Sequence, residues 1–340
     1  MADVLEAVRT SKTLLNTLEV RPIENGERDR WDRLMANHHY LGKRLVGETL
    51  RYVALLEGQW AALLGWSSAA FKSRFRDEWI GWTEQQRWQR LKYLANNSRF
   101  LILPGIHVQN MASKALALNL KRLAKDWQTR YNHPVVLAET FVDPDFFPGT
   151  CYKAAGWSKL GSTRGYGRSA GRYYKHGSYK LIFVYPLHRE VKRLLSASFL
   201  GPELCPESLM DISNLDVDGL RAALGAMQDP RKLRGIRYRH ETVLAIGIYA
   251  WLSGAKSYLT MGKWAKQLTQ QQLKMFGCRL HEDKRCYIPP SEATLRRAMA
   301  CVDPGELSRV VTRWLEVQGK ELPADSPPWR PALFVKGGRR

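Results

Sequence analysis

The sequence lacks the segments that would place it in a membrane or outside the cell. No stretch reaches the roughly 18 consecutive apolar residues of a membrane-spanning helix, and the first twenty residues lack a basic segment leading into an apolar one. Cysteine is scarce, since the chain has only five, at positions 151, 205, 278, 286 and 301. An odd number of scattered cysteines argues against a disulfide framework and suits a reducing compartment. We therefore expect a cytoplasmic protein with free thiols and no membrane partner.

Acidic residues are also in deficit. The 340 residues include 53 Lys and Arg against 32 Asp and Glu, which gives a net charge of +21. There is no low-complexity tract, and hydrophobic residues make up 44% of the chain, so wholesale disorder is excluded. The length predicts two domains, with three as the alternative. A charge of this size predicts a polyanionic partner, either DNA or RNA.

The N-terminal half has the pattern of an α/β domain. Alternating apolar residues over 52–66, interrupted by Gly58, predict a β-hairpin. A strand over 99–108, an amphipathic helix over 110–132 and a strand over 135–141 follow. A short helix is expected within CYKAAGW, residues 151–157. This order predicts a mixed sheet with helices packed on it.

Changes in composition along the chain predict its domain boundaries. We expect an N-terminal segment (1–20), an α/β domain (21–195) with a basic arm (161–180), a linker (196–215), an all-α domain (216–318) and an irregular basic tail (319–340). Glycine and proline mark the linker. Ser291 is expected to cap one helix of the C-terminal domain, and Asp303 followed by Pro304 to begin another.

Two features of the α/β half resemble known families. The order strand, long helix, strand and then CYKAAGWSKLGST (151–163) resembles the GNAT acyltransferase fold, with Tyr152, Gly156 and Trp157 in matching places. The family's phosphate-gripping Arg-x-x-Gly-x-Gly loop corresponds here to VQNMAS, which argues against a cofactor and leaves acyl transfer as a third alternative.

The second resemblance in this half is more specific. The blocks NHHYLGKRLVGETLRYVALLEGQWAALLGWSSAAFKSRFRDEWIGW, NNSRFLILPGIHVQNMAS and ETFVDPDFFPGTCYKAAGW look like the Druantia protein A family of antiphage-defence components, over roughly residues 20–190. The resemblance implies a bacterial protein of phage defence or mobile elements that acts with other defence-system proteins.

The C-terminal half resembles another family. DPRKLRGIRYRHETVLAIGIYAWLSGAKSYLTMGKWA and PPSEATLRRAMACVDPGELSRVVTRWL are similar to the helical segment that precedes the catalytic domain of H-repeat-type insertion-sequence transposases. Those enzymes continue into an Asp-Asp-Glu metal site. Here the corresponding stretch is ALFVKGGRR, with Val335 where the first Asp would stand. We expect DNA binding without transposition by this chain alone.

Basic residues provide the candidate nucleic-acid contacts, because they neutralise phosphates and release counterions. In the arm, aromatic rings that can stack on bases stand among the cations. The alternatives are a solvated loop and a solvated helix entry. The candidates are Arg164, Arg168, Arg172, Tyr173, Tyr174, Lys175 and Lys180 in the arm, Arg231, Lys232, Arg234, Arg237 and Arg239 before a helix, and Arg296 and Arg297 on the helix capped by Ser291.

An enzymatic alternative uses the end of the strand over 135–141. Glu139 and Asp143 are candidates for general base or metal chemistry, with Cys151 and Tyr152 as nucleophile or general acid. The alternative is a purely structural role, with Asp143 forming a turn and Cys151 packing in the core. No metal site is predicted, and the enzymatic alternative leaves room for a divalent metal as a cofactor.

A polar cluster, His38, His39 and Tyr40, precedes the hairpin. It is a candidate for substrate contact in an N-terminal cleft, with helix-end packing as the alternative.

Overall fold

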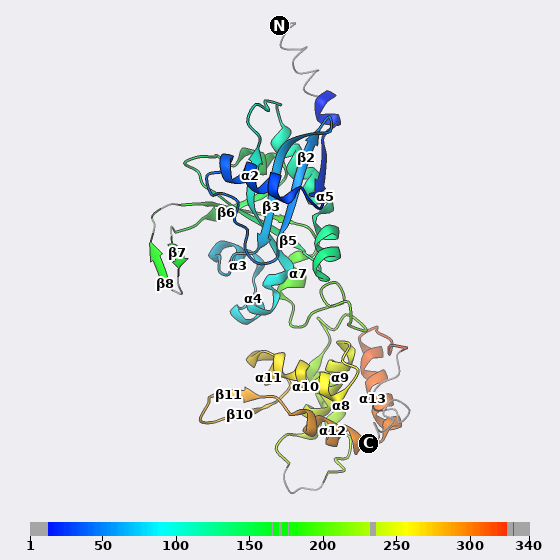
Figure 1. Ribbon diagram of the computed structural model, residues 1–340. Helices are drawn as coiled ribbons and strands as arrows, with labels where there is room; N and C mark the ends of the chain where they lie inside the picture. The colour runs from blue at the N-terminus through cyan, green and yellow to red at the C-terminus, as the bar shows by residue number, and fades with distance from the viewer. Residues whose placement is uncertain are drawn as a thin grey trace, which may run out of the picture. The chain divides into compact units, whose positions relative to one another are not determined.

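The chain forms two compact units that divide between Ser196 and Ala197 (Figure 1). The computed structural model describes residues 13–164, 166–169, 172–175, 177, 179–231, 236–324 and 329, with the backbone alone for 166–169 and 172–175. Among the helices in these ranges, none combines the length and the apolar character needed to cross a membrane.

The first unit is built on a seven-stranded mixed sheet. Its order is β1 (Glu19–Pro22), β2 (Leu50–Leu56), β3 (Gln59–Ser68), β4 (Leu94–Ile102), β5 (Leu137–Val142), β9 (Leu181–Pro186) and β6 (Ser158–Ser162). Only the central β4–β5 pair is parallel, since each other neighbouring pair is antiparallel. The β2–β3 hairpin confirms the predicted one, and it turns at Glu57 and Gly58, both with positive φ.

Helices cover both faces of this sheet. The long helix α5 (Met111–Tyr131) confirms the predicted amphipathic helix, and it buries Leu116, Leu123 and Trp127 in one cluster with Tyr52 of β2. The next residue of β2, Val53, belongs to a second cluster with residues of α2 (Arg28–His38). Successive strand residues point to opposite faces, so one strand contributes to both cores.

The remaining helices of this unit are α3 (Arg74–Ile80), α4 (Glu84–Arg90), a 3₁₀ turn (Leu91–Tyr93), α6 (Thr150–Ala154) and α7 (Val191–Ser196).

Two strand expectations need correction. The strand expected over 99–108 runs instead from Leu94 to Ile102, because Pro104 lacks the N–H that a ladder needs and Gly105 has a positive φ. The basic arm, for which a solvated loop was the alternative interpretation, contains regular strands. Its first residues belong to β6, and β7 (Tyr166–Ser169) pairs antiparallel with β8 (Arg172–Lys175) as a separate two-stranded sheet.

The second unit is mainly helical, as predicted. Its elements are α8 (Val217–Gly225), α9 (His240–Leu252), α10 (Tyr258–Gln267), α11 (Gln270–Met275), β10 (Arg279–His281), β11 (Cys286–Ile288), α12 (Glu292–Ala300) and α13 (Pro304–Val317). The antiparallel β10–β11 hairpin is an addition to the all-α expectation. Both predicted caps are present, because Ser291 accepts a hydrogen bond from the Thr294 amide and Asp303 accepts one from the Glu306 amide.

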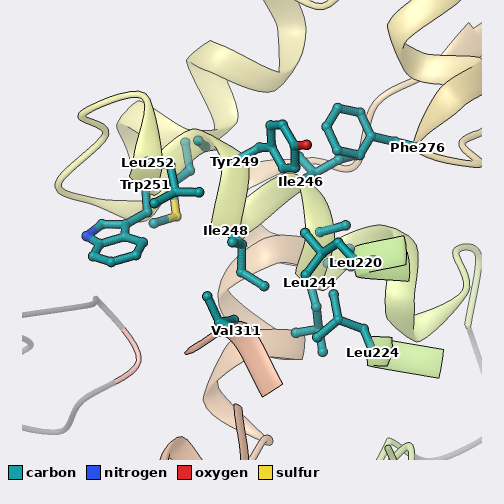
Figure 2. Packing of buried hydrophobic residues seen from close by; sticks show 14 of the residues in the cluster. Leu220, Leu224, Leu244, Ile246, Ile248, Tyr249, Trp251, Leu252, Phe276 and Val311 are labelled. Atoms are coloured by element: carbon teal, nitrogen blue, oxygen red, sulfur yellow. The ribbon is translucent and has the colours of Figure 1, made fainter. Parts of the chain in front are cut away.

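Helix α9 forms the centre of this unit, and eleven consecutive residues, 242–252, are buried. A helix that is apolar all round must be surrounded by other elements. Figure 2 shows Leu220 and Leu224 of α8 and Val311 of α13 beside Leu244 and Ile248 of α9. The segment 196–215 contributes to the same core, through Phe199, Ile212 and Leu215.

Candidate functional site

A cavity of the first unit lies where β4 and β5 cease to pair. Their ladder runs only from Leu94 opposite Leu137 to Asn96 opposite Glu139, although β4 continues to Ile102 and β5 to Val142. Beyond the last paired residues, both strands contribute side chains to the lining of a cavity of about 370 Å³. A register shift against β3 leaves Ser98 as an extra residue in β4, and such a bulge bends its strand at this point.

A hydrogen-bonded group at this cavity ties β4, β5 and α6 together. The Tyr152 hydroxyl donates to Asn97 Oδ1 at 2.7 Å, and the Thr140 hydroxyl donates to the Asn97 carbonyl at 2.9 Å. Burial raises the pKa of Tyr152 above its ordinary value, so the phenol is neutral near pH 7. Tyr152 is therefore a fixed donor to Asn97, a residue that sequence analysis did not single out.

Two further predicted residues border the same cavity. Burial raises the pKa of the Cys151 thiol, which keeps it protonated and weakly nucleophilic at neutral pH. Asp143 is buried, and its Oδ1 accepts a hydrogen bond from the Asp145 amide at 3.2 Å. That bond is the turn chemistry expected of an Asp-Pro-Asp sequence.

Glu139 lies apart from these groups. Its Oε1 accepts from the Ala70 amide at 2.6 Å, and its Oε2 accepts from Arg76 at 2.9 Å, with both charged side chains fully buried. Glu139 is separated from the cavity because successive residues of β5 point to opposite faces of the sheet. Thr140 points to the cavity, and its neighbour Glu139 points to the other face. The structure thus brings Asp143, Cys151 and Tyr152 to one cavity and places Glu139 in a buried ion pair.

Exposed aromatic rings stand at the cavity mouth. Tyr40 lies 5.0 Å from His39, 5.0 Å from Phe146 and 6.0 Å from Phe147, measured between ring centroids. Phe146 is 62% exposed and Phe147 is 51% exposed. Sequence analysis proposed the histidines and Tyr40 but missed the two phenylalanines, whose signal is an apolar pair within an otherwise polar loop.

The loop that carries Tyr40 is held by polar contacts. His39 Nδ1 accepts from the Leu41 amide at 3.1 Å, and the Arg99 guanidinium donates to the carbonyls of Leu41, Gly42 and Arg44. Burial, together with the Arg99 charge, lowers the pKa of His39 to about 4. His39 is consequently uncharged at neutral pH.

The described residues give little support for a metal or an acyl-CoA cofactor. They contain no group of three or more His, Cys, Asp or Glu placed to hold a metal ion. The stretch 106–113, which leads into α5, has no glycine. A backbone grip on pyrophosphate needs such bare positions, so these residues do not fit that group.

The basic residues before α9 divide into two kinds. Arg231 donates to both carboxylate oxygens of Asp229 at 2.8 Å and to the Tyr238 carbonyl at 3.1 Å. The hydrogen bond from Arg231 lowers the pKa of Asp229 to about 2. Arg231 therefore uses its guanidinium for contacts with Asp229 and Tyr238 of its own segment, whereas the side chains of Arg237 and Arg239 are exposed. Lys232 and Arg234 lie outside the described residues.

Helix α12 exposes its two predicted arginines. Leu295, Ala298 and Met299 form its buried face, while Arg296 and Arg297 point to solvent. Arg296 is 3.2 Å from Glu292, and Arg297 donates to the Ala293 carbonyl at 3.1 Å.

Arg164 and Lys180 lie near the two ends of the arm. Arg164 is exposed, and Lys180 is half-buried. The side chains of Arg168, Arg172, Tyr173, Tyr174 and Lys175 lie outside the described residues.

Comparison with protein families gives two matches. The model of the family described as Druantia protein DruA matches residues 2–173, about half of the chain, and the model described as DDE_Tnp_1-associated matches residues 221–315. Both confirm resemblances that the sequence suggested. The search of curated proteins found no match.

Comparison with solved structures gives acetyltransferases at low similarity. Aminoglycoside acetyltransferase AAC(6')-Ib in complex with coenzyme A matches at 12% identity and a TM-score of 0.35, over 51% of this chain and 96% of that one. The ribosomal-protein-S18-alanine N-acetyltransferase from Escherichia coli matches at 13% identity and a TM-score of 0.32, over 50% and 94%. The putative acetyltransferase yncA from Salmonella typhimurium matches at 10% identity and 0.33, over 52% and 96%.

Proposed function

This chain belongs to the Druantia protein DruA family, and on that premise we propose that it is a nucleic-acid-binding component of a bacterial defence system or mobile element. It binds DNA, or alternatively RNA, and acts with partner proteins of the same system. The transposase-associated segment supports this proposal, since it occupies most of the second unit.

The observation that carries the proposal is the exposed basic side of α12. Arg296 and Arg297 are adjacent on a capped helix whose opposite side is anchored in the core by Leu295 and Met299. A helix fits the major groove of DNA, and arginine contacts both phosphates and guanine edges. A rigidly anchored helix with two outward arginines is suited to that docking.

Further cations lie on the elements around α12. Helix α10 contacts α12, and the hairpin β10–β11 precedes it. The exposed cations there are Lys263 and Lys266 of α10, Arg279 of β10, and Lys284 and Arg285 of the hairpin turn. They would extend the phosphate-binding surface without reading sequence. The arm of the first unit is a two-stranded ribbon, which is the other element that a major groove admits.

Salt dependence of binding tests the role of α12. We expect the double variant Arg296→Gln, Arg297→Gln to weaken duplex binding and to reduce the slope of log K against log salt by about 1 for each lost phosphate contact. Fluorescence anisotropy with labelled duplex, single-stranded DNA and RNA measures it. The control is Arg309→Gln, which removes an exposed cation from α13. Equal slopes for the two variants would exclude α12 as the binding surface.

An enzymatic second candidate rests on the cavity of the first unit, which gathers Asp143, Cys151 and Tyr152. If this cavity modifies or cuts nucleic acid, products should form on a denaturing gel with wild-type protein and magnesium, and Asp143→Asn should abolish them. If the protein binds the nucleic acid but leaves its strands chemically unchanged on the gel, the chemistry belongs to a partner protein.

A further inference from the structure

We propose that the cavity between β4 and β5 accepts one unstacked nucleobase, from a single strand or a flipped-out position. The inference rests on the proposed nucleic-acid binding and adds a second contact, on the first unit, that distinguishes bases from bare backbone. It stands on four features: exposed rings, cavity size, a lining without cations, and cations just outside.

The first feature is the cluster of rings at the mouth. Tyr40 comes from the loop after α2, while Phe146 and Phe147 come from the loop between β5 and α6, and all three border the cavity. Three large aromatic side chains exposed together are unusual on a protein surface and mark a binding site. Every base has a π-face, so aromatic platforms bind single strands by stacking whatever the sequence.

The second feature is the cavity itself. Its volume of about 370 Å³ lies at the small end of ligand pockets, which hold roughly 300 to 1,000 Å³. That space admits one nucleoside-sized group and excludes a base pair with its two backbones. Apolar walls from Phe100, Ile102 and Val142 suit the faces of a base. The Thr140 hydroxyl donates to the Asn97 carbonyl, and its oxygen can still accept a hydrogen bond from the edge of a base.

The third and fourth features concern charge. The described residues that line the cavity include Asp143 and the imidazoles of His38 and His39 but no Lys or Arg, so a phosphate or carboxylate would find no permanent cation inside. His39 is uncharged at neutral pH and stacks on Tyr40. Lys43 and Arg44, by contrast, are exposed on the loop that follows Tyr40. This division suits a neutral base inside and its phosphates outside.

The test compares two single strands of equal charge, one with normal bases and one with abasic sites throughout. We expect wild-type protein to bind the normal strand about tenfold more tightly, because stacking is lost in the other. The triple variant Tyr40→Leu, Phe146→Leu, Phe147→Leu keeps apolar surface but removes the rings, and should bind both strands alike. Trp88→Leu is the control, since Trp88 is 65% exposed on α4 and does not line the cavity.

A second readout needs no variant. Strands carrying 5-iodouracil, crosslinked to wild-type protein by ultraviolet light, should label Tyr40, Phe146 or Phe147. Labels elsewhere only, or equal affinity of wild-type protein for normal and abasic strands, would overturn the base site while duplex binding through α12 persisted. Absence of binding to every nucleic acid would instead overturn the proposed function.

Discussion

Among single residues, Glu139 shows most clearly how position within a strand decides a role. Glu139→Ala should lower the free energy of unfolding by about 3 kcal/mol, because it leaves the Ala70 amide without its acceptor and the buried Arg76 charge with Asp77 as its remaining carboxylate partner. Urea denaturation measures the loss. Glu78→Ala is the control, since its pair with Arg74 is more than half exposed and should contribute about 0.5 kcal/mol or less. Equal stability of the two variants would contradict the buried pair.

His39 provides a prediction about pH. Its folded-state pKa of about 4 lies below its ordinary value of 6.5, so the folded protein binds fewer protons than the unfolded chain between these values. Stability should therefore be fully present above pH 6.5 and should fall as the pH decreases toward 4. His39→Asn does not titrate, so its stability should decline less over that window. Parallel stability curves for the two proteins would show that His39 is not involved.

Residue types in the sequence were enough to suggest Tyr152, Cys151, Asp143 and the His38–Tyr40 cluster, which all border one cavity. The partners of those residues were not predictable. Asn97 is 55 residues from Tyr152, and Arg76 is 63 residues from Glu139. Such contacts depend on strand register and on which face a side chain occupies, and neither follows from local sequence.

At the scale of elements, Gly262 fixes how closely α10 and α12 approach. A Cβ at this position would lie 3.2 Å from the Glu292 Cα and 3.3 Å from its nitrogen, which are backbone atoms that cannot move aside alone. Gly262→Ala should lower the melting temperature despite the higher helix propensity of alanine, worth about 1 kcal/mol. Gly225→Ala on α8 meets nothing closer than 4.0 Å and should be neutral or slightly stabilising. The reverse order would contradict this close packing.

Elements with local signals were predicted well. The amphipathic spacing of α5, the turn at Gly58 and the caps at Ser291 and Asp303 are all encoded within a few residues. The arm's ribbon and the β10–β11 hairpin were missed because their strands have only three or four residues, too few for a clear alternation of apolar and polar positions. The cavity itself arises where the β4–β5 ladder ends, which is a non-local feature.

For the whole molecule, the net charge of +21 sets the electrostatics of every encounter. Binding of a nucleic acid by such a protein releases counterions from the phosphates, so affinity should fall steeply and linearly on a log–log plot as salt rises. Under the proposals made above, the two units would contribute differently: α12 of the second would contact backbone and groove, and the cavity of the first would contact single bases.

A salt series of binding isotherms tests this account most directly, with duplex DNA, single-stranded DNA and RNA measured by anisotropy on the full chain. The account predicts measurable affinity at low salt and a negative slope of about 0.9 for each duplex phosphate neutralised. No affinity for any of the three, or an affinity that does not change with salt, would contradict it.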